Sequence, residues 1–171
     1  EKFFNTYKVR EAFEDSGLSW DTLEKIYEDY TRRLPEMKKI ADRLQDEISK
    51  VIDFHVHSIH NRCKDPEHLI EKIIRKVGVE KRQKYKNTNE RNYLRIVRDL
   101  MGIRILILSK EEWRTVHDFL LKVDEDSRYD MHMAEMPRAY IRYGDRDIFN
   151  YTIHKEYTDK GYRSQHYIFK Y

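Results

Sequence analysis

Apolar residues recur at helical spacing in the first fifty positions, between long runs of charged side chains. The clearest stripe follows Pro35 and consists of Met37, Ile40, Ala41, Leu44 and Ile48. Intervals of three and four residues predict an amphipathic helix with one buried face. Proline is suited to the first turn of a helix, so we expect one helix to end before Pro35 and another to begin there. Residues 1–50 are therefore predicted to form an N-terminal helical cap.

The next helix is predicted to begin at Asp65 and Pro66, after an extended segment at 51–64. Aspartate is a good N-cap, and proline is tolerated at the first helical position because its missing N–H has no partner there. The buried face of this helix is predicted to consist of Leu69, Ile70, Ile73, Ile74 and Val77. Gly78 is predicted to end the helix.

Helices and strands alternate in the rest of the chain, and strands become more frequent towards its end. We expect a helix at 89–100 that buries Tyr93, Leu94, Val97 and Met101. The apolar run 103–108 is typical of a central strand, and Ser109 with Glu112 forms a capping-box pattern for another helix. Short tyrosine-rich strands are predicted at 139–143, 149–157 and 162–171. This order predicts an α+β fold, in which helices pack on a mixed, partly antiparallel sheet.

Composition and charge narrow the class of protein only in part. Lysine and arginine total 34 against 31 acidic residues, so partners must be inferred from where charge lies rather than from the net charge of +3. The single cysteine, Cys63, excludes an internal disulfide and suits a reducing, cytoplasmic compartment. Its spacing from His55, His57 and His60 does not fit a zinc site. The apolar stretch 105–108 is too short to cross a membrane, and no signal peptide is visible.

Basic residues gather around the predicted helix start at Asp65. Arg62 and Lys64 are two apart on an extended segment, so both side chains leave the same face. His68 and Lys72 are four apart and therefore lie on one side of the helix. Because the free amide groups at a helix start attract anions, this pattern indicates a polyphosphate-binding site. The alternative is a solvated pair of basic residues before an ordinary helix.

Three segments in a fixed order resemble the synthetase domain of the RelA/SpoT family and its small alarmone synthetase relatives. They are Arg62–His68 together with Lys72, Asp99–Arg104 and Gly161–His166. The resemblance covers residues 50–171, and it implies a nucleotidyltransferase-like core at 51–171. It further implies a pyrophosphokinase that uses Mg²⁺ to move pyrophosphate from ATP to the 3′-hydroxyl of GDP or GTP, producing (p)ppGpp.

The resemblance assigns the first segment to ATP. It places Arg62, Lys64 and Lys72 around the phosphates, where cations offset the charge of the transferred group. His68 stands where relatives carry serine. Histidine is bulkier than serine and can titrate, and it can still donate a hydrogen bond to phosphate.

Asp99 and Arg104 surround the start of the predicted central strand. The resemblance makes Asp99 the magnesium ligand, and one aspartate is enough because Mg²⁺ often takes a single carboxylate plus substrate phosphates. The alternative is a surface aspartate at a helix end, where a negative charge is unfavourable. Arg104, with Arg62, matches an arginine that stacks on adenine, a role suited to a planar guanidinium. We expect Arg104 to be buried, so a structural ion pair is its alternative role.

The resemblance assigns Tyr162 and His166 to the acceptor. A tyrosine ring can stack on a purine, which is worth about 1–3 kcal/mol per base. In an extended strand Ser164 points to the same side as both residues, so it is predicted to belong to the acceptor site. The chain contains 13 tyrosines, so a structural role is the alternative for Tyr162.

The segment before this motif leaves the identity of the acceptor open. Residues 155–160 form a shorter loop than in relatives and lack their proline, and Lys155 and Lys160 are predicted to supply its charges. Toxic relatives use the 3′ end of tRNA or adenine nucleotides instead of GDP or GTP. The basic segment 81–98, which contains Tyr85, is either an RNA-binding surface or a solvated loop. Another alternative is a degenerate domain that binds nucleotide or RNA without turnover.

The family's catalytic glutamate lies beyond the tyrosine–histidine motif, in a later strand. No Glu-x-Gln segment follows His166 before Tyr171, so we expect the 171 residues to be part of a longer chain and to turn over slowly alone. Robust turnover would instead assign the base to His68 or His166. The expected partners are ATP and a guanine nucleotide, with tRNA, a second copy of the chain or an antitoxin as alternatives.

Overall fold

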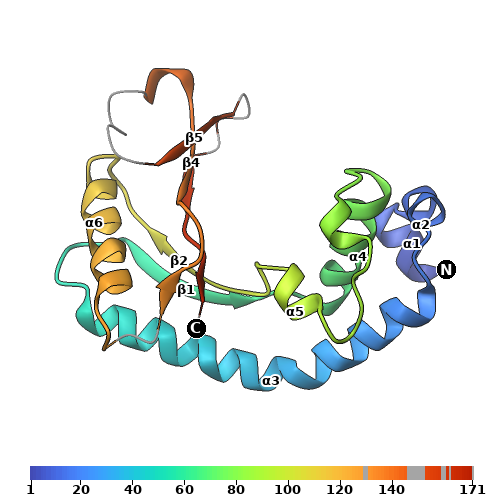
Figure 1. The fold of residues 1–171 in the computed structure, drawn as a ribbon. Helices are drawn as coiled ribbons and strands as arrows, with labels where there is room; N and C mark the ends of the chain where they lie inside the picture. The colour runs from blue at the N-terminus through green and yellow to red at the C-terminus, as the bar shows by residue number, and fades with distance from the viewer. Residues whose placement is uncertain (129–130, 146–152, 159–160, 162, 171) are drawn as a thin grey trace. The chain divides into compact units, whose positions relative to one another are not determined.

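The computed structural model describes residues 1–128, 131–145, 153–158, 161 and 163–170. The fold is α+β, as predicted, and contains several small sheets (Figure 1). The chain divides into two compact units, one formed by 1–51 with 59–105 and the other by 52–58 with 106–171. The separate prediction of a cap at 1–50 and a catalytic core at 51–171 concerns function and stays a prediction. In the described part of the chain, no helix is both long and apolar enough to cross a membrane.

The first unit is mainly helical. Its elements are α1 (Lys2–Tyr7), α2 (Arg10–Ser16), α3 (Trp20–Val51), α4 (Pro66–Gly78), the 3₁₀ turn η1 (Gln83–Tyr85) and α5 (Tyr93–Ile96). The apolar face predicted for the helix after Asp65 is confirmed, because all five of its residues are buried in α4. They pack with Leu23, Ile26 and Tyr30 of α3 and with Tyr93 of α5 in one core.

The predicted break at Pro35 is wrong, because α3 continues through it as one helix (Figure 1). A proline inside a helix removes one backbone hydrogen bond and crowds the preceding turn. Apolar residues are buried on both sides of Pro35, from Leu23 to Tyr30 before it and from Ala41 to Ile48 after it. We attribute the continuity to this burial, which offsets the local cost of the proline.

Gly78 is the last residue of α4, close to the predicted end, but its role is packing rather than a left-handed turn. A Cβ at this position would lie 1.9 Å from the carbonyl oxygen of Ala12 in α2. Only glycine leaves room for that backbone to approach. Gly78 therefore fixes how closely α2 and α4 pack.

Strands β1 (Ser58–Cys63) and β2 (Met101–Leu106) pair with each other. The Lys64 amide donates to the Leu100 carbonyl at one end, and the His57 amide donates to the Leu106 carbonyl at the other, so the strands are antiparallel. The run at 103–108 was predicted to be a buried central strand, and this is wrong. None of its residues is buried, because among the described residues this ladder has two strands and no neighbouring strand covers its edges.

The helix predicted at 89–100 is much shorter than expected. Only α5 is α-helical in this stretch, and Leu94, predicted to be buried, is exposed. Asn89 and Asn92 explain the local geometry, since the side-chain oxygen of Asn92 accepts from the Asn89 amide and that of Asn89 accepts from the Arg91 amide. Asparagine side chains that bond the backbone in this way favour turns over a continuous helix.

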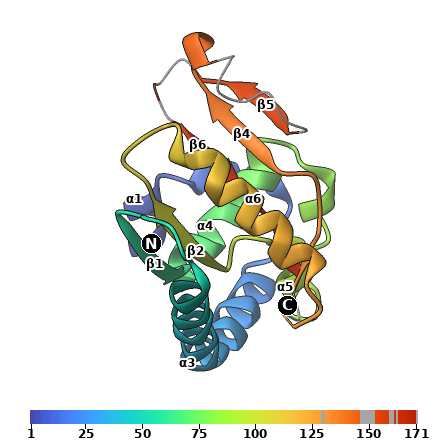
Figure 2. The ribbon, with the colours of Figure 1, turned by 90° about the vertical axis from the view of Figure 1, so that its left-hand side faces the viewer.

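The second unit contains α6 (Glu112–Glu125) and several short strands. These are β3 (His132–Met133), β4 (Arg138–Ile141), β5 (His154–Tyr157), β6 (Ser164–His166) and β7 (Phe169–Lys170). Strand β4 lies between β5 and β6 (Figure 2), parallel to β5 and antiparallel to β6. Strands β3 and β7 form a separate antiparallel pair. The expectation of a mixed, partly antiparallel arrangement is thus confirmed.

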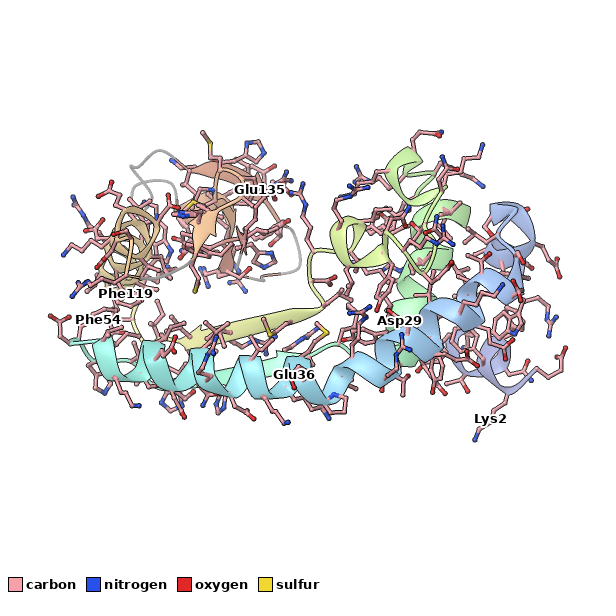
Figure 3. All side chains as sticks on the ribbon, turned by 60° about the horizontal axis from the view of Figure 1, so that its bottom comes forward. Lys2, Asp29, Glu36, Phe54, Phe119 and Glu135 are labelled. Atoms are coloured by element: carbon pink, nitrogen blue, oxygen red, sulfur yellow. The ribbon has the colours of Figure 1, made fainter. Side chains whose placement is uncertain are left out.

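Helix α6 begins at Glu112, with Glu111 rather than the predicted Ser109 at the N-cap position, and it supplies part of the core of the second unit. The Glu112 carboxylate accepts from the Ser109 amide at 3.0 Å, which is one half of a capping box. Trp113 packs against Ala139, Ile141 and Ile153 on one face of the β5-β4-β6 sheet. Further along α6, the ring of Phe119 contacts that of Phe54 (Figure 3), which explains why 52–58 belong to this unit.

Candidate functional site

The start of α4 forms as predicted, but its amide groups are already occupied. One carboxylate oxygen of Asp65 accepts from the amides of Glu67 and His68, at 2.9 and 3.1 Å. The negative charge of Asp65 also satisfies the positive end of the helix dipole. The expectation that free amides at this helix start bind phosphate is therefore wrong. At this helix start, phosphate binding must therefore come from side chains.

Three predicted site residues come together in the first unit. Lys64 Nζ lies 3.1 Å from one carboxylate oxygen of Asp99, and Lys72 Nζ lies 2.7 Å from the other. Lys64 follows β1, Lys72 lies in the second turn of α4, and Asp99 precedes β2. The two lysine side chains are largely buried, at 10% and 17% exposed, whereas the Asp99 side chain is 47% exposed. The cluster is thus open to solvent on its acidic side.

The electrostatics of this cluster favour an anionic ligand. Burial opposes ionisation of Asp99, but hydrogen bonding and charge interaction with Lys72 and Lys64 outweigh it, so the pKa of Asp99 is lowered. Burial lowers the pKa of Lys72, and Lys64 adds to this effect, while Asp99 acts in the opposite direction. Two cations face one carboxylate, so the cluster has an excess of one positive charge that a phosphate oxygen can complement.

Tyr30 of α3 holds the backbone beneath the cluster, a role that the sequence interpretation missed. Its buried hydroxyl lies 2.7 Å from the carbonyl oxygen of Lys64, to which it donates, and 3.3 Å from that of Leu100. One side chain therefore contacts the chain next to both Lys64 and Asp99. The sequence signal was the helical stripe that contains Ile26 and Tyr30, which indicates a buried face but not a hydroxyl contact.

Arg62 and Arg104 lie on the same open face of the β1–β2 ladder. Asn61 marks the covered face, because its amide group donates to Gln45 and Asp42 of α3. Arg62 is adjacent to Asn61 and is exposed, as alternation along a strand requires. Arg104 is also exposed, so the expectation that it is buried is wrong.

His68 lies against the N-terminal helix α1. Its ring meets that of Tyr7 edge to face, with ring centroids 5.3 Å apart. The Tyr7 hydroxyl donates to the Glu67 carboxylate at 3.0 Å. The first turn of α4 therefore contacts α1, and the contact described for His68 is with an aromatic ring.

The predicted acceptor residues belong to the second unit, and two of them lie outside the described residues: Tyr162 and Lys160. In β6, Ser164 Oγ and His166 Nε2 are 3.1 Å apart. Gly161 has a φ of +70°, and a Cβ there would lie 2.0 Å from the Arg142 guanidinium. The start of the motif therefore requires glycine.

Lys155 does not share a face with Ser164 and His166. It pairs with Ala139, as Gln165 does from the other side of β4. Residues paired across strands point to the same side, so Lys155 lies with the buried Ala139 and opposite to Ser164. The structure does not bring Lys155 to the face that carries the acceptor motif.

Asp145 is a buried carboxylate that the sequence interpretation missed. Its side chain is 1% exposed and accepts from Arg163 Nε at 2.6 Å and Lys110 Nζ at 2.9 Å, as well as from the Arg142 amide. The hydrogen bond from Arg163, the largest effect, holds the pKa of Asp145 far below its usual range although burial acts to raise it. Arg163, which lies within the predicted acceptor motif, is therefore engaged by Asp145. An isolated aspartate followed by a distant arginine has no sequence signature.

Asp99 is suited to hold Mg²⁺ only together with phosphate groups. It offers two hard oxygen atoms on a half-exposed side chain, and each oxygen is in contact with a lysine. Among the described residues, no group of three or more His, Cys, Asp or Glu side chains is arranged to hold a metal ion. The described residues for which this holds include His55, His57, His60 and Cys63. Phosphate oxygens and water would have to complete the coordination of a magnesium ion at Asp99.

The basic loop that precedes α5 is exposed, but its aromatic residue is not. Lys81, Arg82, Lys84 and Lys86 are exposed. Tyr85 is buried in the core of the first unit, so it cannot stack on a base. The loop can therefore bind a nucleic acid through the charge of its exposed lysine and arginine side chains but not through stacking by Tyr85.

Comparison of the chain with protein-family models, with curated proteins and with solved structures found no match. The resemblance to RelA/SpoT synthetases therefore stays a prediction. What supports a function is the arrangement of Lys64, Lys72 and Asp99 in one unit and of Ser164 and His166 in the other.

Proposed function

We propose that this protein is a magnesium-dependent nucleotide pyrophosphokinase of the RelA/SpoT type with a nucleotidyltransferase-like core, acting in the cytoplasm. The observation that carries the proposal is the cluster of two largely buried lysines around the half-exposed Asp99. Buried lysines are uncommon unless they are paired, and here two of them share one carboxylate. A polyphosphate supplies the missing negative charge, and ATP is the donor implied by the resemblance.

Lys64 and Lys72 are proposed to bind the phosphates of ATP while Asp99 holds the metal. The more highly charged polyphosphate would attract both ammonium groups and release the Asp99 oxygens for coordination. Bound Mg²⁺ would supply charge neutralisation at the β- and γ-phosphates. The lysines would stabilise the charge that develops on the transferred group, and they are already fixed by burial and by the Tyr30 contact.

Arg62 and Arg104 are proposed to bind the adenine. Both are exposed on one face of the β1–β2 ladder, at the end of which Lys64 follows β1. Guanidinium groups stack on flat rings as ammonium groups do not. Replacing either arginine is therefore expected to lower the affinity for ATP more than the affinity for inorganic tripolyphosphate, which has no base.

The acceptor is proposed to be a guanine nucleotide that contacts Ser164, His166 and Tyr162. A second candidate, the 3′ end of tRNA, is favoured by the exposed cations of the 81–86 loop. Because Tyr85 is buried, binding there would be electrostatic and strongly dependent on salt. Replacing Lys81, Arg82, Lys84 and Lys86 with alanine should weaken tRNA binding and flatten its salt dependence if tRNA is the acceptor.

The deciding experiment measures ATP binding and product formation separately. Calorimetry with a non-hydrolysable ATP analogue and Mg²⁺ reports on the donor site, and chromatography after incubation with GDP, GTP, AMP or deacylated tRNA reports on transfer. We expect Lys72→Met to weaken binding at least tenfold and Asp99→Asn to remove the Mg²⁺ dependence. The matched control is Lys76→Met, one turn further on, because Lys76 pairs with Glu80 instead of Asp99. Equal binding by the Lys72 and Lys76 variants would contradict the proposal.

A further inference from the structure

A cavity of about 150 Å³ lies in the first unit, between the last turn of α2 and the loop that follows α4. It is lined by Asp15 and Ser16 of α2, by Val77 of α4, and by Lys81, Arg82 and Lys86 of the loop. All of these residues belong to the first unit. None of them is part of the proposed donor cluster, so the cavity is a separate feature of the same unit.

The walls of this cavity are fixed by close packing and by backbone hydrogen bonds. Helix α2 packs directly on α4 (Figure 1), where Gly78 leaves no room for a side chain beside the Ala12 carbonyl. On the loop side, the Arg82 amide donates to the Lys76 carbonyl at 2.8 Å. Tyr85, which lies in the same loop, is buried in the core of the first unit. The cavity is therefore preformed, and a ligand would lose little affinity to ordering of the chain.

The basic residues of the cavity have more positive charge than their neighbours neutralise. In the described part of the chain, no carboxylate pairs with Lys81 or Lys86, and both side chains are exposed. Arg82 Nε lies 3.5 Å from a Glu80 oxygen, but two other cations already hold this carboxylate. Three cations and one carboxylate, Asp15, line the cavity, which leaves an excess of two positive charges.

Lys81 adopts a left-handed backbone conformation shortly after α4, with a φ of +49°. Glycine is the usual residue at such a position, because a Cβ is crowded there. The chain therefore carries a long cationic side chain where the backbone favours glycine. This choice costs some stability and supplies one of the three cations of the cavity.

We propose that this cavity binds a terminal phosphate group, a site that goes beyond the proposed function and does not depend on it. A terminal phosphate carries a charge of about −1.5 to −2 at pH 7, which matches the excess of two positive charges. A phosphodiester within a nucleic-acid strand carries only about one negative charge and matches it less well.

The size of the cavity agrees with this ligand. Its volume of about 150 Å³ corresponds to about five water molecules in the liquid, which is enough for a phosphate group. Sites that enclose a drug-sized ligand measure about 300–1,000 Å³, so the rest of the phosphorylated molecule would lie outside the cavity. A small phosphorylated molecule and the 5′ end of an RNA share this chemistry.

The test follows the backbone amide signals by two-dimensional NMR while inorganic phosphate is added. We expect the signals of 15–16 and 81–86 to shift and to saturate, and dimethyl phosphate, which has one charge, to bind more weakly. Lys81→Gly is expected to weaken phosphate binding about tenfold, as for the loss of one charge-assisted contact. Its unfolding midpoint should be unchanged or raised, because relief of the left-handed conformation offsets the entropy that glycine loses on folding. Lys81→Arg should keep the binding.

Lys8→Gly is the matched control, since Lys8 is also left-handed, with a φ of +53°, and does not line the cavity. It removes the same charge and the same strain, and it should leave phosphate binding unchanged. Titration with 5′-phosphorylated and dephosphorylated tRNA distinguishes the two sources of phosphate. A preference for the phosphorylated form assigns the site to an RNA end. Equal binding of both forms, weaker than that of inorganic phosphate, assigns it to a small molecule.

Two results would overturn the phosphate site: no shift of the signals of 15–16 and 81–86 with phosphate, or equal phosphate binding by Lys81→Gly and Lys8→Gly. The donor cluster is read separately, from the shifts that ATP with Mg²⁺ causes around Lys64 and Asp99. Phosphate binding at the cavity without ATP binding at that cluster contradicts the proposed function alone. ATP binding at the cluster without phosphate binding at the cavity contradicts the phosphate site alone.

Discussion

The Tyr30 hydroxyl lies 2.7 Å from the carbonyl oxygen of Lys64 and donates to it, which joins the long helix α3 to the residue that binds Asp99. Lys64 in turn donates its amide to Leu100, next to Asp99. The backbone around the proposed donor site is therefore fixed from below by a single buried side chain. Helix α3 positions this cluster as well as covering the core.

Removing the Tyr30 hydroxyl tests whether Tyr30 positions the proposed donor site in addition to stabilising the fold. Tyr30→Phe is expected to lower the free energy of unfolding by about 1 kcal/mol, since one buried hydrogen bond is lost. It should also weaken ATP binding, because Lys64 loses its support. Tyr93→Phe is the matched control, since the Tyr93 hydroxyl donates to Asp29 at 2.9 Å. Urea unfolding measures the stability of each variant, and calorimetry measures its affinity for ATP. An equal effect of both variants on ATP binding would rule out a positioning role for Tyr30.

The Asp99 cluster should make part of the stability depend on pH. The pKa of Asp99 is lowered in the folded protein from an unfolded value of about 3.9, so its contribution is complete above that value. The contribution is lost as the pH falls through the folded pKa. The difference in urea midpoint between the wild type and Asp99→Asn should be largest near pH 7 and shrink below about pH 4. A difference that stays constant down to pH 3 would show that ionisation of Asp99 is not the cause.

Asp145 should be far more important for folding than Asp126, a partly buried aspartate that pairs with an exposed arginine. Asp145→Asn leaves Arg163 and Lys110 without a counter-charge, and breaking a buried pair of this kind costs about 3–5 kcal/mol. The partners are themselves partly exposed, so we expect the lower end of that range. Asp126→Asn, which disrupts the pair with the exposed Arg128, should change stability by less than about 0.5 kcal/mol. Chemical unfolding of both variants measures the contrast, and similar losses would contradict it.

Replacing two glycines with alanine should change the stability by different amounts. At Gly78 the new Cβ would lie 1.9 Å from the Ala12 carbonyl oxygen, so Gly78→Ala is expected to cost about 1–3 kcal/mol as α2 is pushed away. At Gly102 no heavy atom lies within 4 Å of the added Cβ, so Gly102→Ala should be neutral or slightly stabilising. Thermal unfolding of the two variants tests the close packing of α2 on α4. A neutral Gly78→Ala would show that these helices are not packed so tightly.

The sequence by itself determined those features that depend on neighbours along the chain. The apolar face of α4, its Asp65 cap and the capping contact of Glu112 follow from spacing and from side-chain chemistry within one or two turns. The acceptor motif was placed on a strand for the same reason, since alternation puts Ser164 and His166 on one side. Local rules failed at Pro35, because burial of apolar residues on both sides kept α3 continuous.

Only the tertiary structure decided which distant residues meet. Lys72 and Asp99 are far apart in sequence, and their contact depends on how α4 packs with α3 and α5 in the core of the first unit. Asp145 and Arg163 show no pattern at all in the sequence, yet a buried carboxylate must find a partner because an uncompensated charge is costly to bury. Arg104 was expected to be buried in a central strand, whereas the ladder has two strands and leaves it exposed. The burial of a strand residue depends on the elements that pack around the strand. The sequence of one strand does not determine how many other strands pair with it.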